Sequence, residues 1–321
     1  GKRDIVIMPG CRDHLPVHFL HRDYKRFGSH IGIRNGYLSL IDRIVIPCGK
    51  CVSCRLKKSR DWSVRLMCEK RVTPRKSYFL TLTYDDDHLE SWSLIPDHLT
   101  KFMKDLRRHF EYHHEENGIR FFACGEYGEK YHRPHFHVIL FNCNIRDLKL
   151  RSEYNNIRLF ESPSLSKIWN RGFVAIGEVT VQSCQYVARY TTKKMFKCMD
   201  DYEEAGIKPE FIRMSRMPGI GREYYDQHKD HIYDVDGIEF ADYLGRVKKY
   251  RPSKYFDDLM SIENPDLFAG VKELRLIAAQ MSMQNAMQRL GMIEEDVYAY
   301  RMVIHSAVLN KMPREPSRQR R

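Results

Sequence analysis

The chain has 321 residues, of which 42% are hydrophobic and 30% charged, a composition typical of a folded protein with a sizeable core. No apolar run approaches the roughly 20 residues that span a bilayer, and the first residues lead into no signal-peptide core. We therefore expect neither a membrane protein nor a secreted one.

The charge balance is basic, since 54 Lys and Arg against 42 Asp and Glu give a net charge of +12. Between Arg43 and Lys76 the chain has eleven basic residues and only two acidic ones. Basic side chains gain affinity for nucleic acids by releasing counterions from the phosphates. This concentrated stripe favours a polyanionic partner, and a basic protein without such a partner is the alternative.

Three closely spaced cysteines, Cys48, Cys51 and Cys54, form two overlapping Cys-x-x-Cys pairs. That spacing lets successive thiolates turn onto one tetrahedral zinc ion, and Cys11 is the expected fourth ligand. Cys68 and a nearby histidine compete for that role, and an iron–sulfur cluster or free thiols are the alternatives to zinc. The odd total of nine cysteines argues for a reducing compartment.

The hydrophobic patterns predict alternating strands and helices in the middle of the chain. Residues 78–84 alternate in the way that a half-buried strand does, and Asp97 is expected to cap a helix that stops near Asn117-Gly118. We further predict strands over residues 119–126, 135–141 and 173–180, a short helix near 165–169, and helices over 181–197, 273–290 and 294–309.

This order of elements predicts an α+β fold, an antiparallel sheet with helices packed on it. We expect a basic, Cys-rich N-terminal module over residues 1–75, a central α+β domain over 76–200, and a mostly helical C-terminal region with a basic tail over 201–321. The chain contains no Gly-x-x-x-x-Gly-Lys-[Ser/Thr] loop, so no NTP site is expected.

Two histidines of the predicted strand, His135 and His137, share one face of it and lie about 6.6 Å apart along the strand. If residues 127–134 are the loop of a hairpin, Glu126 lies opposite His135 on the same face. Two imidazoles and a carboxylate can hold one divalent cation, with Mg²⁺ or Mn²⁺ expected. Glu129 is the lesser candidate for the third ligand. The alternative is that the histidines are only polar residues on an exposed sheet face.

Tyr186 and Tyr190 recur four residues apart in a predicted helix and share a side with Lys193 and Lys197. Small and apolar residues take the opposite side, so we expect the tyrosines to lie outside the core. They could stack on bases, or, beside cations and a metal, attack a phosphodiester and leave a phosphotyrosine and a free 3′-hydroxyl. DNA contacts are expected from Arg55, Lys57, Lys58, Arg60, Arg189, Lys194 and Lys197.

Five motifs occur in order over residues 48–194, and as a set they resemble the replication-initiation proteins of microviruses, most closely the gokushovirus branch, which are HUH endonucleases. The motifs are Cys48-Gly49-Lys50-Cys51-x-x-Cys54-Arg55, Phe79-Leu80-Thr81-Leu82-Thr83-Tyr84, Cys124-Gly125-Glu126-Tyr127-Gly128, Arg133-Pro134-His135-Phe136-His137 and Tyr186-Val187-Ala188-Arg189-Tyr190-Thr191-Thr192-Lys193.

The resemblance implies a five-stranded antiparallel sheet flanked by helices, with the histidine motif on a central strand. It also implies rolling-circle replication, in which Tyr186 and Tyr190 nick single-stranded DNA at the phage origin and later end the round. By motif, His135 and His137 are metal ligands and Lys193 is a phosphate or phenolate partner. The host helicase and polymerase would be partners, in the cytoplasm of an infected bacterium.

Two other functions remain open from the sequence. A plasmid initiator, relaxase or transposase of the same superfamily would use the same chemistry on another substrate. A non-catalytic, zinc-containing protein that binds single-stranded nucleic acid would use the tyrosines only for stacking. Replacing both tyrosines by phenylalanine separates the enzyme from the binding protein, because stacking survives the loss of the hydroxyls.

Overall fold

The structure, a computed structural model, describes residues 31–34, 37–40, 52–128, 130–154, 157–190, 199–241 and 245–291. The chain divides into two compact units. One comprises residues 1–57 and 272–321, and the other comprises residues 58–271. The second unit contains the large sheet and the residues of the candidate site.

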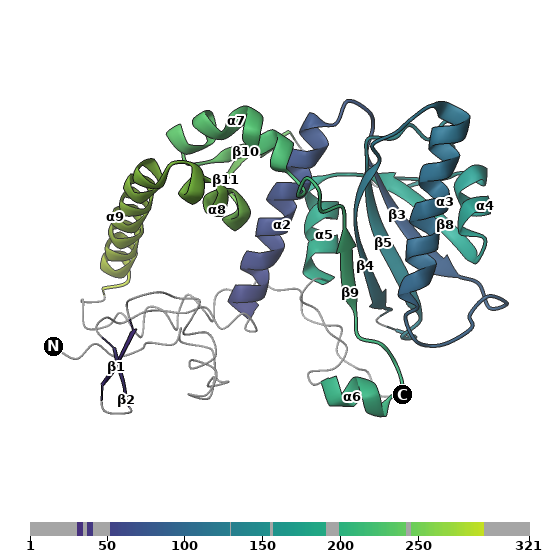
Figure 1. Ribbon diagram of the computed structural model, residues 1–321, viewed down its shortest axis with the longest axis horizontal. Coiled ribbons are helices and arrows are strands. Elements are labelled where there is room, and N and C mark those ends of the chain that lie inside the picture. Colours follow the sequence, from purple (N-terminus) through teal and green to yellow (C-terminus); the bar gives the residue numbers. More distant parts are fainter. Residues whose placement is uncertain are drawn as a thin grey trace. The chain divides into compact units, whose positions relative to one another are not determined.

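The described elements carry the labels of Figure 1. In chain order they are β1 (Ile31–Arg34), β2 (Tyr37–Leu40), α2 (Val52–Val72), β3 (Tyr78–Tyr84), α3 (Pro96–His114), β4 (Arg120–Tyr127), β5 (Pro134–Phe141), β6 (Lys149–Tyr154), β7 (Ile157–Glu161), α4 (Pro163–Trp169), β8 (Gly172–Glu178), α5 (Val181–Tyr190), α6 (Met199–Glu204), β9 (Phe211–Met214), α7 (Arg222–Asp234), β10 (Ile238–Ala241), β11 (Val247–Tyr250), α8 (Lys254–Glu263) and α9 (Pro265–Arg289).

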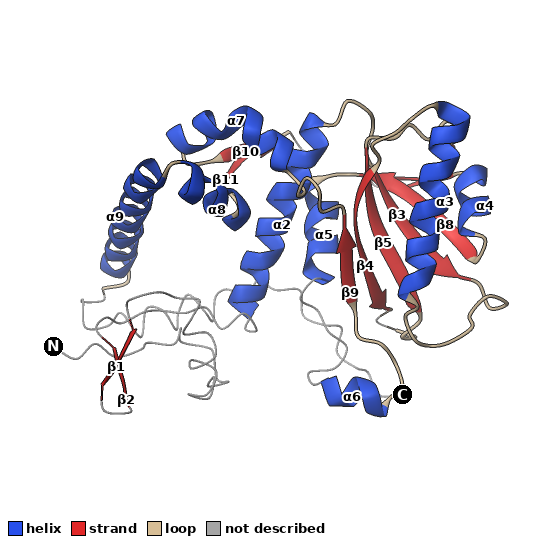
Figure 2. Cartoon of the chain, viewed as in Figure 1, coloured by secondary structure: helices blue, strands red, loops and turns tan. Residues whose placement is uncertain are grey.

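The second unit is built on an antiparallel sheet with the strand order β6-β7-β8-β3-β5-β4-β9, and helices pack on it (Figure 2). The predicted mixed fold is confirmed, and the histidine motif lies on β5, between β3 and β4. The predicted strand number is wrong, because the sheet has seven strands rather than five.

The additional strands come from the hairpin of β6 and β7, which joins β8 through the pairing of Phe160 with Ile176. Every residue of β6 is exposed, so this strand lacks the apolar alternation by which a half-buried strand is recognised in a sequence. The remaining five strands, β8-β3-β5-β4-β9, are contiguous in the sheet.

One face of the sheet packs against α3 and α4. Alternate residues of β3 are buried on this face, as predicted for residues 78–84. The predicted apolar stripe of α3 is also confirmed, and each of its side chains contributes about 1.5–3 kcal/mol by leaving water. The stripe consists of Leu99, Phe102, Met103, Leu106 and Phe110.

The start of α3 differs from the prediction that Asp97 caps it. The helix begins at Pro96, after an extended Ile95 that makes no side-chain capping bond, and Asp97 lies in the first turn. Proline suits this first position because its φ is preset and its missing N–H would have no helical partner. Asp97 is therefore placed to favour the helix dipole and does not cap the helix.

The other face of the sheet packs against α2 and α5, through a buried cluster that includes Leu66, Ile139 and Val187. On another side of α2, Val64 and Cys68 pack into a second cluster, with α7, α8 and the hairpin of β10 and β11. Because α2 is buried on two sides, it joins these two cores within the second unit.

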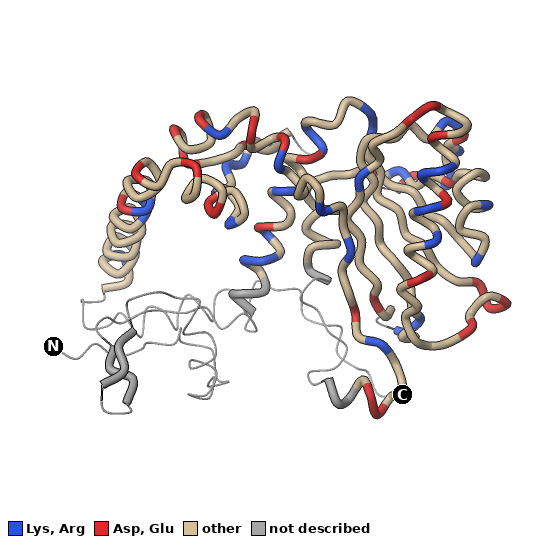
Figure 3. The backbone as a smooth tube through the Cα atoms, viewed as in Figure 1, with Lys and Arg blue, Asp and Glu red and all other residues tan. Residues whose placement is uncertain are grey.

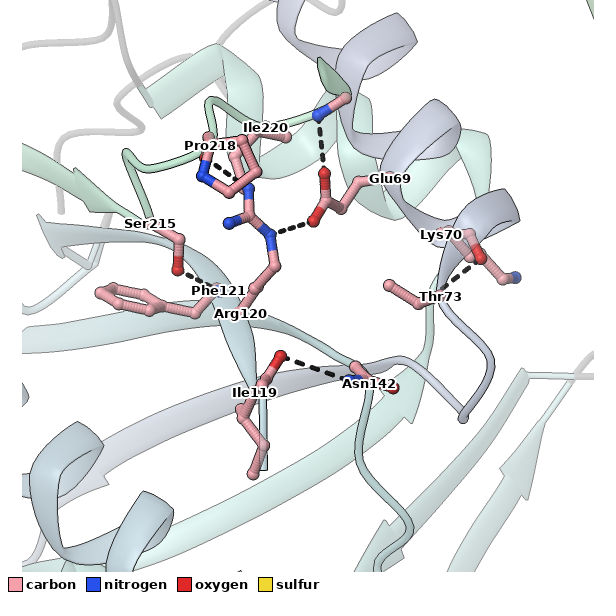
Figure 4. Close-up of polar contacts among 12 residues, drawn as sticks. Glu69, Lys70, Thr73, Ile119, Arg120, Phe121, Asn142, Ser215, Pro218 and Ile220 are labelled. Carbon is pink, nitrogen blue, oxygen red and sulfur yellow. Dashed lines mark hydrogen bonds and ion pairs between the residues drawn. The ribbon is translucent and has the colours of Figure 1, made fainter. Parts of the chain in front are cut away.

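A buried carboxylate anchors α2 to the sheet and to the turn after β9 (Figure 4). Glu69 is 3% exposed. One of its oxygens accepts a hydrogen bond from Nε of Arg120 on β4, and the other accepts one from the backbone N–H of Gly221 at 2.6 Å. Arg120 also donates to the carbonyl oxygen of Pro218 at 2.7 Å. This network holds α2 over the face that carries the histidines.

Replacing Glu69 with alanine should lower the free energy of unfolding by about 3–5 kcal/mol, because Arg120 then keeps a buried charge without its partner. Urea titration measures the loss. The matched control is Glu153→Ala, which breaks the exposed pair of Glu153 with Arg158 and should cost less than about 1 kcal/mol. Equal losses in the two variants would contradict the anchoring role.

The division into three parts, at residues 75 and 200, stays a prediction. The helix expected over residues 294–309 lies outside the described residues, whereas the helix expected over 273–290 is the later part of α9. Within the described residues, no helix combines the length and the apolar character that crossing a membrane requires.

Candidate metal centre and its tyrosine

The antiparallel pairing of β4 with β5 places Glu126 directly opposite His135. His137 follows two residues along β5 and therefore lies on the same face. The apolar residues between and after the histidines, such as Phe136 and Val138, point to the opposite face and join the core beneath α3. The predicted hairpin geometry of Glu126 and His135 is confirmed.

Both imidazoles meet the same carboxylate oxygen. Nε2 of His135 lies 2.6 Å from Oε1 of Glu126, and Nε2 of His137 lies 2.9 Å from it. Nδ1 of His135 lies 3.1 Å from the carbonyl oxygen of Arg133, and Nδ1 of His137 lies 3.1 Å from Oγ1 of Thr81. Since a carbonyl can only accept, Nδ1 of His135 carries a proton, which leaves Nε2 as the ligand atom of the neutral ring.

The protonation of the three groups suits a cation. Burial raises the pKa of Glu126, but hydrogen bonds from His135 and His137 outweigh burial and lower it overall, so the carboxylate stays ionised. Burial lowers the pKa of His137 and keeps its imidazole neutral. For His135 the effect of burial is outweighed by the hydrogen bond to Glu126, so its pKa is raised.

The group formed by Glu126, His135 and His137 fits a divalent metal ion. Their ligand atoms lie within 4.8 Å of one another, and no other set of three such residues converges in this way in the described part of the chain. Oε2 of Glu126 is buried and has no hydrogen-bond partner among the described residues. An orphaned carboxylate oxygen beside two imidazoles is a set of donors that a bound cation would satisfy.

Tyr186 of α5 lies beside this group. Its ring meets that of His137 edge to face, with centroids 5.2 Å apart, and Phe79 stacks on His137 at 5.4 Å. Tyr186 is 40% exposed, whereas Cys184 and Val187 of the same helix are fully buried against the sheet. The helix therefore holds a partly accessible phenol against one of the metal-ligand candidates.

The basic stripe of α2 runs close to α5. Oγ of Ser59 donates a hydrogen bond to the carbonyl oxygen of Gln185 at 3.2 Å, one residue before Tyr186. Lys58 and Arg60, on either side of Ser59, are exposed. Figure 3 shows how Lys and Arg recur along α2. Basic side chains thus lie near the tyrosine, where a DNA backbone would need them.

Several predicted site residues lie outside the described residues, and their roles stay predictions. These are Cys11, Cys48, Cys51, Glu129, Lys193, Lys194 and Lys197, together with the side chains of Cys54, Arg55, Arg189 and Tyr190. Cys68, the competitor for the fourth zinc position, is fully buried among apolar side chains, and burial raises the pKa of its thiol. A buried, protonated thiol is poorly suited to bind zinc.

The sequence reasoning did not identify the groups that orient the histidines. Thr81 pairs with His137 across β3 and β5, and the carbonyl of Arg133 comes from the hairpin loop. The polar residues at every second position of β3, Thr81 and Thr83, were the signal available, since apolar residues would be expected there beneath a covered face.

The comparisons with known proteins agree with this site. The family of the replication-associated protein ORF2 matches residues 77–195, which include the histidines and Tyr186. The "Replication-associated protein ORF2" of Spiroplasma virus 4 is 40% identical over 271 residues, which cover 80% of this chain and 82% of that protein. The chain belongs to the replication-associated proteins of gokushovirus-type microviruses.

Two further members of this replication-associated family are more distant. "Replication-associated protein ORF4" of Chlamydia phage 1 is 31% identical over 67% of this chain and 53% of its own length. "Replication-associated protein VP4" of Bdellovibrio phage phiMH2K is 32% identical over 66% of this chain and 70% of its own length. No solved structure matches the chain. A role in phage replication follows from the family, and it favours a phage protein over a plasmid initiator or transposase.

Adding Mn²⁺ should raise the unfolding temperature of this replication-associated protein, since an ion that binds only the folded state stabilises it by about 2.7 kcal/mol at 100 times its dissociation constant. Glu126→Gln keeps the size of the side chain but removes its charge, and should weaken Mn²⁺ binding at least about tenfold by calorimetry. Protons compete for His135, whose pKa is raised, so affinity should fall as the pH drops through that pKa.

The matched control is His231→Ala, which removes an exposed histidine from α7. This variant should bind Mn²⁺ like the unaltered protein. If Glu126→Gln and His231→Ala bind the ion equally well, the group on β4 and β5 is only a hydrogen-bonded cluster.

Proposed function

We propose that this replication-associated protein nicks and rejoins single-stranded DNA at the phage origin through a covalent 5′-phosphotyrosine, and so starts and ends rolling-circle replication. The observation that carries the proposal is the contact of Tyr186 with His137, beside a convergent carboxylate and imidazole pair, in a chain of a phage replication family. Such a combination of nucleophile and metal ligands suits an HUH endonuclease.

The proposed reaction exchanges one phosphodiester for another. The phenolic oxygen of Tyr186 bonds to the phosphorus, and the bond from phosphorus to the 3′ oxygen of the preceding nucleotide breaks. The phenol loses its proton and the departing 3′ oxygen gains one, so atoms and charge balance. Because a phosphoester replaces a phosphoester, the reverse reaction can rejoin the strand. The free 3′-hydroxyl would be extended by the host polymerase with the help of a host helicase.

Each part of the site has a role in this proposal. A phenol is a poor nucleophile near neutral pH, since its pKa is about 10, so neighbouring cations such as Lys193 would favour the phenolate. Glu126, His135 and His137 would hold Mg²⁺ or Mn²⁺, which when bound would polarise the phosphate and make the phosphorus more electrophilic.

The basic residues Lys57, Lys58 and Arg60 of α2, with Arg55, Arg189, Lys194 and Lys197, would attract and position the DNA backbone. Tyr190, one helical turn after Tyr186, would be the second nucleophile, which a second cleavage needs while the first tyrosine is still joined to DNA.

Incubation with labelled single-stranded origin DNA and Mn²⁺ should produce a protein–DNA adduct on a denaturing gel and a product with a free 3′-hydroxyl. The double variant Tyr186→Phe/Tyr190→Phe should lose the adduct by roughly a thousandfold or more, because it lacks both hydroxyls. Its affinity for the DNA should stay the same, because phenylalanine keeps the ring. Either single variant should cleave once yet fail to form circles.

The matched control is Tyr112→Phe, at an exposed tyrosine of α3 on the opposite face of the sheet. This variant should form the adduct normally. Adduct formation by the double tyrosine variant would refute the nucleophile assignment. Salt-sensitive binding without cleavage by the unaltered protein would support the non-catalytic DNA-binding alternative.

We also propose that Cys11, Cys48, Cys51 and Cys54 hold a structural zinc ion. Metal analysis should find about one zinc per chain, and Cys48→Ala should lose it. Cys143→Ala is the matched control, because burial raises the pKa of the Cys143 thiol to about 12 and keeps it protonated in the core. Zinc retained by Cys48→Ala would remove this cysteine from the ligand set.

A further inference from the structure

An aromatic side chain of the sheet is exposed on the face that carries the histidines. Phe173 of β8 is 60% exposed, whereas Val174 and Ile176, on the opposite face of the strand, are buried beneath α3 and α4. A large apolar ring in a sheet usually packs under a neighbouring element. Phe173 instead presents much of its ring to solvent.

Phe173 belongs to the same cross-strand row as two of the candidate metal ligands. Thr83 of β3 pairs with His135 on one side and with Phe173 on the other, and His135 pairs with Glu126. Residues paired across neighbouring strands share a face, and the strands are about 4.8 Å apart. The backbone of Phe173 therefore lies two strands, or roughly 10 Å, from that of His135.

A hollow of about 250 Å³ adjoins this row, between Thr83, His135 and the loop that connects β4 to β5. The loop is held closed by hydrogen bonds between Gly128 and Arg133 at 3.0 Å and between His132 and Gly128 at 2.9 Å. It carries a second exposed ring, because Tyr131 lines the hollow and is 68% exposed.

The loop also supplies basic side chains to the hollow. Nζ of Lys130 lies 4.8 Å from the centre of the Tyr131 ring, and both residues line the hollow. Arg133 lines it as well and pairs with Asp86 at 2.7 Å. Exposed rings with adjacent cations are the combination that binds unpaired nucleotides, since the rings stack on bases and the cations attract the backbone.

We propose that Phe173 and Tyr131 form a stacking platform for unpaired bases next to the phosphate that is cut, a proposal that rests on the function proposed above. The platform lies on the face of the candidate metal centre and is continuous with it through Thr83. Bases in a duplex stack on each other and leave no free face for Phe173. The platform therefore contributes to a preference for single-stranded DNA, with little dependence on the identity of the base.

The test measures binding of a fluorescently labelled single-stranded origin oligonucleotide to the full chain, by anisotropy, in a chelator that prevents cleavage. Phe173→Ala should weaken binding roughly 10- to 100-fold, as expected for the loss of one stacked base, and Phe173→Trp should restore it. Tyr112→Ala, at an equally exposed aromatic residue of α3 on the opposite face, should bind normally. Because Phe173 is largely exposed, the thermal stability of Phe173→Ala should match that of the unaltered protein.

A second measurement moves a single abasic nucleotide along the oligonucleotide. One abasic position should weaken binding by the unaltered protein but not by Phe173→Ala, because the variant has already lost the partner of that base. Additive losses at every position, or unchanged binding by Phe173→Ala, would overturn the platform. Failure of the unaltered protein to bind single-stranded origin DNA would instead overturn the proposed function.

Discussion

The pairing register of β4 with β5 is the constraint on which the candidate site depends. Because Glu126 stands opposite His135, and His137 follows on the same face, two imidazoles converge on one oxygen of a buried carboxylate. A shift of one residue would turn the carboxylate to the opposite face, into the core beneath α3. The apolar residues that alternate with the histidines stabilise the observed register, so the same pattern builds the core and positions the polar group.

The second constraint is the packing of α2 and α5 on the histidine face. Fully buried residues of α5, such as Val187, hold the helix on the sheet and leave Tyr186 against His137. The buried pair of Glu69 with Arg120 anchors α2 beside it. Farther along the same face, toward Thr83 and the start of β8, the sheet stays accessible. This contrast between a covered and an open part of one face suits a reaction that needs a fixed phenol and an accessible strand of DNA.

Sequence patterns predicted the site better than the periphery of the fold. The strict alternation of residues 78–84 and 135–141 defines half-buried strands, and a short hairpin leaves few possible registers for Glu126. The hairpin of β6 and β7 was missed because an exposed edge carries no apolar alternation, and Asp97 was misassigned because Pro96 starts the helix without a cap. The platform residue Phe173 reads as a core residue in the sequence, and its exposure becomes apparent only from how the described elements are arranged around β8.

The most direct test of the account is the position of a bound ion. Crystals of the full chain grown with Mn²⁺ and an uncleavable single-stranded oligonucleotide should show one anomalous peak in contact with Glu126, His135 and His137, with the Tyr186 hydroxyl facing the phosphate that the ion contacts. An ion bound elsewhere, or a Tyr186 hydroxyl turned away from every phosphate, would contradict the central claim.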